Sequence, residues 1–132
     1  MQMIRTLISK LIQNPRYRPK MSYSQCGEDR ILEFFFREIG QKEIRYLDVG
    51  ANDPKKFSNT YFFYRYFNSR GVIVEPNPAL HRLLKNQRRG DLLIPSGIGV
   101  GKEEVIAEYY EMDWHEFNTF SKKVAYETQE KY

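Results

Sequence analysis

The sequence contains little cysteine and no long hydrophobic run. Cys26 is the single cysteine among 132 residues, so the chain cannot form an internal disulfide and carries no signature of an oxidising compartment. No apolar stretch approaches the ~20 residues that a membrane-spanning helix needs. The opening residues also lack the small-residue cleavage site of a signal peptide. We therefore expect a cytoplasmic protein.

The excess of one sign of charge over the other is also small. The 21 Lys and Arg exceed the 17 Asp and Glu by only four, too few for a nucleic-acid-binding surface, so we expect no nucleic-acid partner. Aromatic residues are abundant instead, because ten Tyr and nine Phe supply material for a core. The length suits one domain, since domains commonly contain ~100–150 residues.

The first twelve residues predict an amphipathic helix. Its apolar residues recur at helical spacing, at Ile4, Leu7, Ile8, Leu11 and Ile12. One interpretation is a helix that packs on its own domain or on a second subunit. The other is a weak contact of residues 1–12 with an anionic membrane surface. Two prolines then break the helix, so we divide the chain into a helix and linker over 1–21 and a domain over 22–132.

Strands and helices alternate along the rest of the chain. We expect helices at 24–39, 58–69 and 78–87, and strands at 44–49, 71–75, 92–100 and 105–112, before a polar tail. This alternation predicts an α/β fold with a Rossmann-like parallel sheet and flanking helices. The continuously apolar strands are typical of parallel strands buried on both faces. In the first helix we expect Ser24 as the cap and an apolar face of Ile31, Leu32, Phe35, Phe36 and Ile39.

Polar residues follow two of these strands. Asp48, Gly50 and Asn52 end the first, and Glu75 and Asn77 end the second. Ligands of such sheets bind beyond the carboxyl ends of the strands. A glycine lets the backbone approach a ligand, and a carboxylate after the second strand can accept hydrogen bonds from two ribose hydroxyls.

The nucleoside expected there carries no pyrophosphate. The segment reads G-A-N-D-P-K and lacks the G-x-G-x-x-G of a dinucleotide site. Asp48, Asp53 and Glu75 would repel a diphosphate and attract a cation. S-adenosylmethionine is such a cation, because its sulfonium and amino groups are positively charged.

Five segments in this order resemble the FkbM-like methyltransferases. They are SYSQCGEDRIL, YLDVGANDP, SNTYFFY, GVIVEPNP and the helix ending in RRGD, so the resemblance covers about residues 22–99. It implies a class I enzyme that transfers a methyl group from S-adenosylmethionine to a hydroxyl of a sugar, polysaccharide or polyketide-like acceptor. It also implies cofactor-binding roles for Asp48, Gly50 and Asn52 at the methionine end, Glu75 and Asn77 at the ribose, Gly97 and Ile98 at the adenine, and Gln25, Glu28 and Asp29 near the same pocket.

Each of these residues also has a structural interpretation. Asp48 and Gly50 can serve a turn, and Glu28 and Asp29 can be first-turn charges on a helix. The Arg88–Arg89 pair is typical of a solvated turn. The candidates for a general base are His115, Asp113 and Asp53, and no spacing selects one of them. We predict no metal ligands.

The sequence lacks the acidic D-x-E-G segment that ends a later strand in the family. We therefore expect a form truncated after the third core strand and one extra strand, with an open sheet edge that a second copy of the chain covers. Two alternatives stay open. One is a non-catalytic module that binds the cofactor or a nucleoside, and the other is a nucleotide-binding Rossmann protein of another class, such as a reductase.

Overall fold

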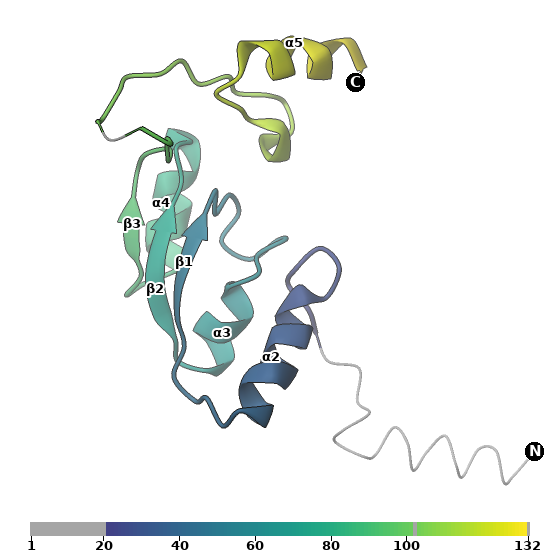
Figure 1. The fold of residues 1–132 in the computed structure, drawn as a ribbon, viewed down its shortest axis with the longest axis vertical. Helices are drawn as coiled ribbons and strands as arrows, with labels where there is room; N and C mark the ends of the chain where they lie inside the picture. The colour runs from purple at the N-terminus through teal and green to yellow at the C-terminus, as the bar shows by residue number, and fades with distance from the viewer. Residues whose placement is uncertain (1–20, 102, 132) are drawn as a thin grey trace, which may run out of the picture.

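Three parallel strands form the centre of the computed structural model, which describes residues 21–101 and 103–131 (Figure 1). The sheet has the order β1-β2-β3, with β1 at Arg45–Val49, β2 at Arg70–Val74 and β3 at Leu92–Ile94. Both strand pairs are parallel. The predicted α/β class with a Rossmann-like parallel sheet is confirmed. The predicted helix at 1–12 and most of the linker lie outside the described residues.

The helices confirm the predicted alternation but differ in length. Helix α4 occupies Pro78–Gln87 as predicted, because Asn77 caps it by accepting the N–H of Ala79 and a proline fits its first turn. Helix α3 covers only Tyr61–Tyr66. It starts late because the Ser58 hydroxyl accepts the Tyr61 N–H, and it ends before Asn68, whose φ of 50° is not helical.

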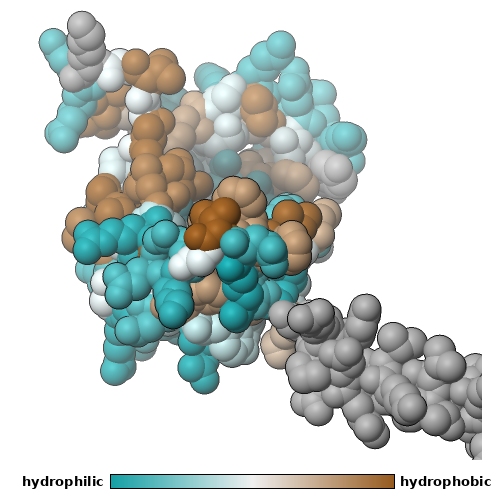
Figure 2. Space-filling model, turned by 60° about the horizontal axis from the view of Figure 1, so that its bottom comes forward, coloured by the Kyte–Doolittle hydropathy of each residue, from teal (hydrophilic) through white to brown (hydrophobic). Residues whose placement is uncertain are grey.

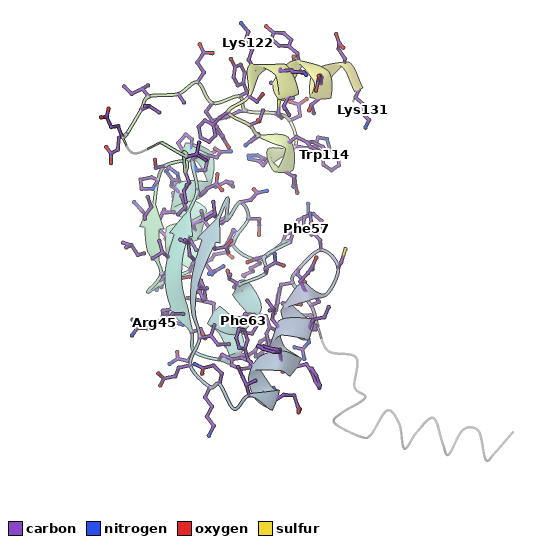
Figure 3. The ribbon with its side chains drawn as sticks, in the orientation of Figure 1. Arg45, Phe57, Phe63, Trp114, Lys122 and Lys131 are labelled. Atoms are coloured by element: carbon purple, nitrogen blue, oxygen red, sulfur yellow. The ribbon has the colours of Figure 1, made fainter. Side chains whose placement is uncertain are left out.

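The helices cover one face of the sheet. Residues of α4 and β2, with Leu84 and Ile73 at their centre, form one buried cluster. A second cluster joins α3 to the start of β1 through Ile44, Phe62 and Phe63. Phe63 lies between α3 and the helix α2, Glu28–Glu38, as Figure 3 shows, and its ring meets the edge of Phe36. This packing holds the strands in register from the helical side.

The opposite face of the sheet is exposed. Leu47 of β1 is 62% exposed and Leu92 of β3 is 61% exposed, whereas Ile73 on the helical face is 1% exposed. The prediction that the strands are buried on both faces is therefore wrong for this chain. In a doubly wound sheet, the second face is covered by helices that follow strands beyond β1. Within the described residues β1 pairs with β2 alone, and no such strand is present.

Helix α2 also differs from its prediction. It begins at Glu28, after a loop in which Ser24 binds Asp29 instead of starting the helix directly. Its buried residues are Asp29 and Glu33. Most of the predicted apolar face points outward: Ile31, Leu32, Phe35 and Ile39 are exposed. Hydrophobic side chains at the surface are plain in Figure 2.

The C-terminal segment lies beyond the carboxyl ends of β1 and β2 (Figure 1). The strand predicted at 105–112 is wrong, because this segment forms only a single antiparallel bridge, between Tyr110 and Thr119. A short 3-10 helix η1 at His115–Phe117 and the helix α5 at Lys122–Lys131 occupy the predicted polar tail. The third strand is also shorter than predicted and stops before Pro95, which has no N–H to donate. No helix in the described part of the chain is long and apolar enough to cross a bilayer.

Candidate functional site

A cavity of about 290 Å³ opens at the carboxyl ends of β1 and β2, between the sheet and the C-terminal segment. Figure 3 shows this end of the molecule, where Trp114 lies far from Arg45 at the start of β1. The structure brings six predicted residues to the cavity wall: Gly50, Asn52, Glu75, Gly97, Ile98 and His115. These residues come from four separate segments, so the fold has assembled them.

Glu75 is the buried carboxylate of the cavity. Its Oε2 accepts the backbone N–H of Asn52 at 2.7 Å, and its Oε1 accepts the backbone N–H of Asn77 at 2.8 Å. A carboxylate has about four acceptor positions, so both oxygens keep capacity for a further donor. The two N–H bonds fix the orientation of the group from the β1 side and from the β2 side. Glu75 thus presents a carboxylate of fixed orientation at the cavity wall.

The turn after β1 bends towards β2. The N–H groups of Gly50 and Ala51 both donate to the carbonyl of Val74, at 2.9 and 3.1 Å. Gly50 has a φ of +70°, and a Cβ placed there would meet no atom within 4 Å. A side chain at Gly50 would therefore be strained and would extend into open space at the cavity wall. The backbone here can approach a ligand closely.

The Asp48 side chain lies on the face of β1 that the helices cover, and Asp48 is not among the residues that line the cavity. Its Oδ2 accepts the hydroxyl of Thr60, at the start of α3. The alternation of side chains along a strand explains this placement, since Val49 points to the cavity and Asp48 to the helices. In this structure Asp48 holds the loop between β1 and α3.

Arg88 connects that loop to the rest of the core. It is 1% exposed, so the predicted solvated turn is wrong at this position, whereas Arg89 is exposed. Arg88 follows α4 and forms an ion pair with Asp91 at 2.9 Å. Its other hydrogen bonds reach the Pro54 carbonyl, Ser58, Thr60 and the Tyr46 hydroxyl. Thr60 thus links Arg88 to Asp48. Sequence reasoning missed this group because an arginine pair before Gly-Asp has the composition of a surface turn.

The 3-10 helix η1 is attached beside the cavity at two points. His115 Nδ1 lies 2.8 Å from the side-chain nitrogen of Asn77, and Lys56 pairs with Glu116 at 3.4 Å. The backbone N–H of Glu116, with a further contribution from Lys56, lowers the pKa of the Glu116 carboxyl. Asn77 therefore lies under the cavity wall, bound to Glu75, to α4 and to η1.

The opposite wall is aromatic. A Cβ at Gly97 would lie 2.5 Å from Phe120, so the missing side chain makes room for that ring. Phe120 packs against Tyr109 with the ring centres 4.9 Å apart, and burial raises the pKa of the Tyr109 phenol. An adjoining cavity of about 420 Å³ shares this wall and extends towards Val105 and Ile106. The combined space is open and apolar on the side where Gly97 and Ile98 lie.

The N-terminal motif lies apart from the cavity wall. Gln25, Glu28 and Asp29 are not among its lining residues. Asp29 is buried, and its carboxylate accepts hydrogen bonds from the hydroxyls of Ser22 and Ser24 and from the N–H of Tyr23. These bonds close the loop that leads into α2.

The two acidic candidates for a general base are also outside the lining. Asp53 accepts the N–H groups of Lys55 and Lys56, in a turn after β1. Asp113 is exposed. Among the described residues no group of three or more His, Cys, Asp or Glu is placed to hold a metal ion. His115 is therefore the candidate nearest to the cavity, as part of its wall.

The observed groups fit the ribose of a nucleoside cofactor. A buried, preset carboxylate faces a cavity whose neighbouring backbone is free of a side chain at Gly50. Residues 48–131 match the family model described as "Methyltransferase FkbM domain". No curated protein matches the chain, and no solved structure matches it.

Proposed function

The chain belongs to the FkbM methyltransferase family, and we propose that its cavity binds S-adenosylmethionine for transfer of a methyl group to a hydroxyl. As acceptor we propose a sugar, a polysaccharide or a polyketide-like molecule. The observation that carries the proposal is Glu75, a buried carboxylate with both oxygens oriented at the cavity wall. Such a group accepts hydrogen bonds from the two adjacent hydroxyls of a ribose.

The charge of the site supports a cationic ligand. Two carboxylates, those of Glu75 and Glu116, belong to residues of the cavity wall, and among the described residues the wall contains no Lys or Arg. The turn after β1 is not glycine-rich and aims no helix N-terminus at a phosphate, because α3 starts only at Tyr61, eleven residues after Gly50. A pyrophosphate would meet the Glu75 carboxylate without a Lys or Arg in the described part of the cavity wall to offset its charge. These features favour S-adenosylmethionine over a dinucleotide.

The residues of this chain would bind the cofactor and hold it in position. S-adenosylmethionine, when bound, supplies an electrophilic methyl group. Glu75 would hold the ribose, the open backbone at Gly50 would admit the methionine part, and the wall of Gly97 and Ile98 would flank the adenine. Orientation of this kind lowers the barrier to an in-line displacement, because the reacting atoms are held close. A base that removes the hydroxyl proton typically adds ~10²–10⁴-fold. Of the three residues considered for this role, Asp53 and Asp113 lie outside the cavity lining and His115 is part of it.

A non-catalytic binding module is the second candidate function. It is favoured by the placement of Asp53 and Asp113, two of the three candidates for a general base, outside the lining of the cavity. Such a module would bind the cofactor and transfer no methyl group. Methyl release with a hydroxylated sugar separates the two functions.

Calorimetric titration tests the common part of both functions. We expect wild-type protein to bind S-adenosylhomocysteine and S-adenosylmethionine and to bind NAD weakly or not at all. Glu75→Gln removes the charged acceptor and places an amide opposite the two backbone N–H groups that now bind the carboxylate. The affinity for S-adenosylhomocysteine should therefore fall about 10- to 100-fold, as expected for hydrogen bonds to a charged group worth ~1.5–3 kcal/mol. Glu104→Gln, at an exposed position, is the matched control. Binding of NAD alone would contradict the proposal.

A further inference from the structure

The side-chain amide of Asn77 has a fixed orientation. Its Oδ1 accepts the N–H of Ala79 at 2.9 Å, as the N-cap of α4. The amide nitrogen must therefore point the other way, where it meets His115 Nδ1 at 2.8 Å. Asn77 is fully buried, so water does not compete for either half of the amide.

This orientation sets the proton of His115. An amide nitrogen is a donor only, so Nδ1 of His115 must be the acceptor. In a neutral imidazole the proton then resides on Nε2. Nε2 has no hydrogen bond within the described residues, and His115 belongs to the cavity wall. The ring thus offers an N–H, and not a lone pair, at its free nitrogen.

Asn77 contacts both Glu75 and His115. The Asn77 backbone N–H binds Glu75 Oε1, while the Asn77 side chain binds His115. One buried residue therefore orients an acceptor, the Glu75 carboxylate, and a donor, the His115 Nε2–H. The ion pair between Lys56 and Glu116 holds η1 from its other side. A purine nucleoside presents the matching set, with ribose hydroxyls as donors and ring nitrogens as acceptors.

We propose that His115 is a specificity-determining residue that donates a hydrogen bond from Nε2 to an acceptor nitrogen of the bound nucleoside base. The inference rests on the proposed function for the identity of the ligand. It gives His115 a role different from that of a general base. A base would need a lone pair on Nε2, and the Asn77 amide places a proton there.

The first test reads the tautomer directly in the ligand-free protein. The chain has two histidines, so His81→Gln assigns the signals of His115 in a two-bond ¹H–¹⁵N spectrum at pH 8.5. We expect Nδ1 to resonate as an unprotonated nitrogen and Nε2 as a protonated one. Asn77→Asp keeps the cap, because Asp and Asn cap helices about equally, and should exchange the two signals. A wild-type ring protonated on Nδ1, or an even mixture, would overturn the inference.

The second test uses S-adenosylhomocysteine as the probe in calorimetry. His115→Phe should bind it about 3- to 10-fold more weakly, as expected for one lost neutral hydrogen bond of ~0.5–1.5 kcal/mol. His115→Gln retains an N–H donor near the position of Nε2 and should bind within about twofold of wild type. Asn77→Asp at pH 8.5 should resemble His115→Phe. Equal affinity of wild type and His115→Phe would overturn the inference.

The two proposals fail separately. If Glu75→Gln weakens binding and His115→Phe does not, the donor role of His115 is wrong and the proposed function stands. If wild type does not bind S-adenosylhomocysteine, the proposed function is wrong, and the tautomer spectrum still tests how Asn77 sets the ring. Analogues of S-adenosylhomocysteine in which one ring nitrogen of the base is replaced by C–H test the same hydrogen bond from the ligand side. The analogue that lacks the accepting nitrogen should bind wild type more weakly, and His115→Phe should not weaken its binding further.

Discussion

Replacing Arg88 should destabilise the chain more than any surface change. Arg88 and Asp91 have side chains 1% and 0% exposed and form an ion pair at 2.9 Å. Arg88→Met keeps much of the volume but leaves the Asp91 carboxylate buried, and among the described residues the Tyr46 hydroxyl and the Gly71 N–H are then its only donors. Breaking a buried pair in this way costs about 3–5 kcal/mol. Domains are stable by only about 5–15 kcal/mol, so the loss would be a large part of the whole.

Urea unfolding followed by circular dichroism measures this loss. Arg89→Met is the matched control, because Arg89 is the exposed neighbour, and it should change the free energy of unfolding by no more than about 0.5 kcal/mol. Asp91→Asn in the Arg88→Met background should cost less than the two single changes together, since no buried charge then remains unpaired. If Arg88→Met lies within about 1 kcal/mol of Arg89→Met, the buried network does not hold the loop as described.

Three further predictions concern the sheet and the turn after β1. Ile73→Ala should cost about 2–5 kcal/mol and Leu47→Ala less than about 1 kcal/mol in the same urea assay, because they lie on the covered and the open face; equal losses would contradict the exposed face. Burial raises the pKa of the Tyr46 phenol, and the hydrogen bond to Asp91 raises it further. The protonated phenol therefore contributes its full stabilisation below pH ~10, and this stabilisation is lost as the pH rises above that value. Tyr46→Phe should therefore flatten the alkaline part of a stability–pH curve, and an unchanged slope would refute this. Gly50→Ala should lower the stability by about 1–2 kcal/mol because of its positive φ; a neutral effect on thermal unfolding would show that the turn relaxes.

The strands and α4 could be predicted because their signals are local. Parallel strands need continuous apolar residues, and the segments around Leu47 and Ile73 supply them. Helix α4 has its cap at Asn77 and a proline in the first turn, so its start could be predicted from a few residues. The strand ends then placed Gly50 and Glu75 at one edge of the sheet, which the structure confirms.

Other features depend on tertiary contacts that no local pattern records. The segment at 105–112 alternates as a strand does, but within the part of the chain that the structure describes it pairs with no neighbour beyond the bridge at Tyr110. The apolar stripe of α2 predicts that these apolar residues are buried. In the described part of the chain, however, the buried residues of this helix are Asp29 and Glu33. Arg88 lies in a sequence typical of a turn, and only the fold brings Tyr46 and Thr60 to its guanidinium group.

Binding of the cofactor ribose by Glu75 is tested by a ¹H–¹⁵N titration of the wild-type protein with S-adenosylhomocysteine. The backbone amides of Asn52 and Asn77 both donate to Glu75, so they report on any ligand that binds this carboxylate. We expect these two signals to shift together and to saturate at one dissociation constant, while the signal of the Arg45 amide, at the far end of β1, does not shift. Shifts confined to other parts of the sheet, or none at all, would contradict the claim that Glu75 holds the cofactor ribose.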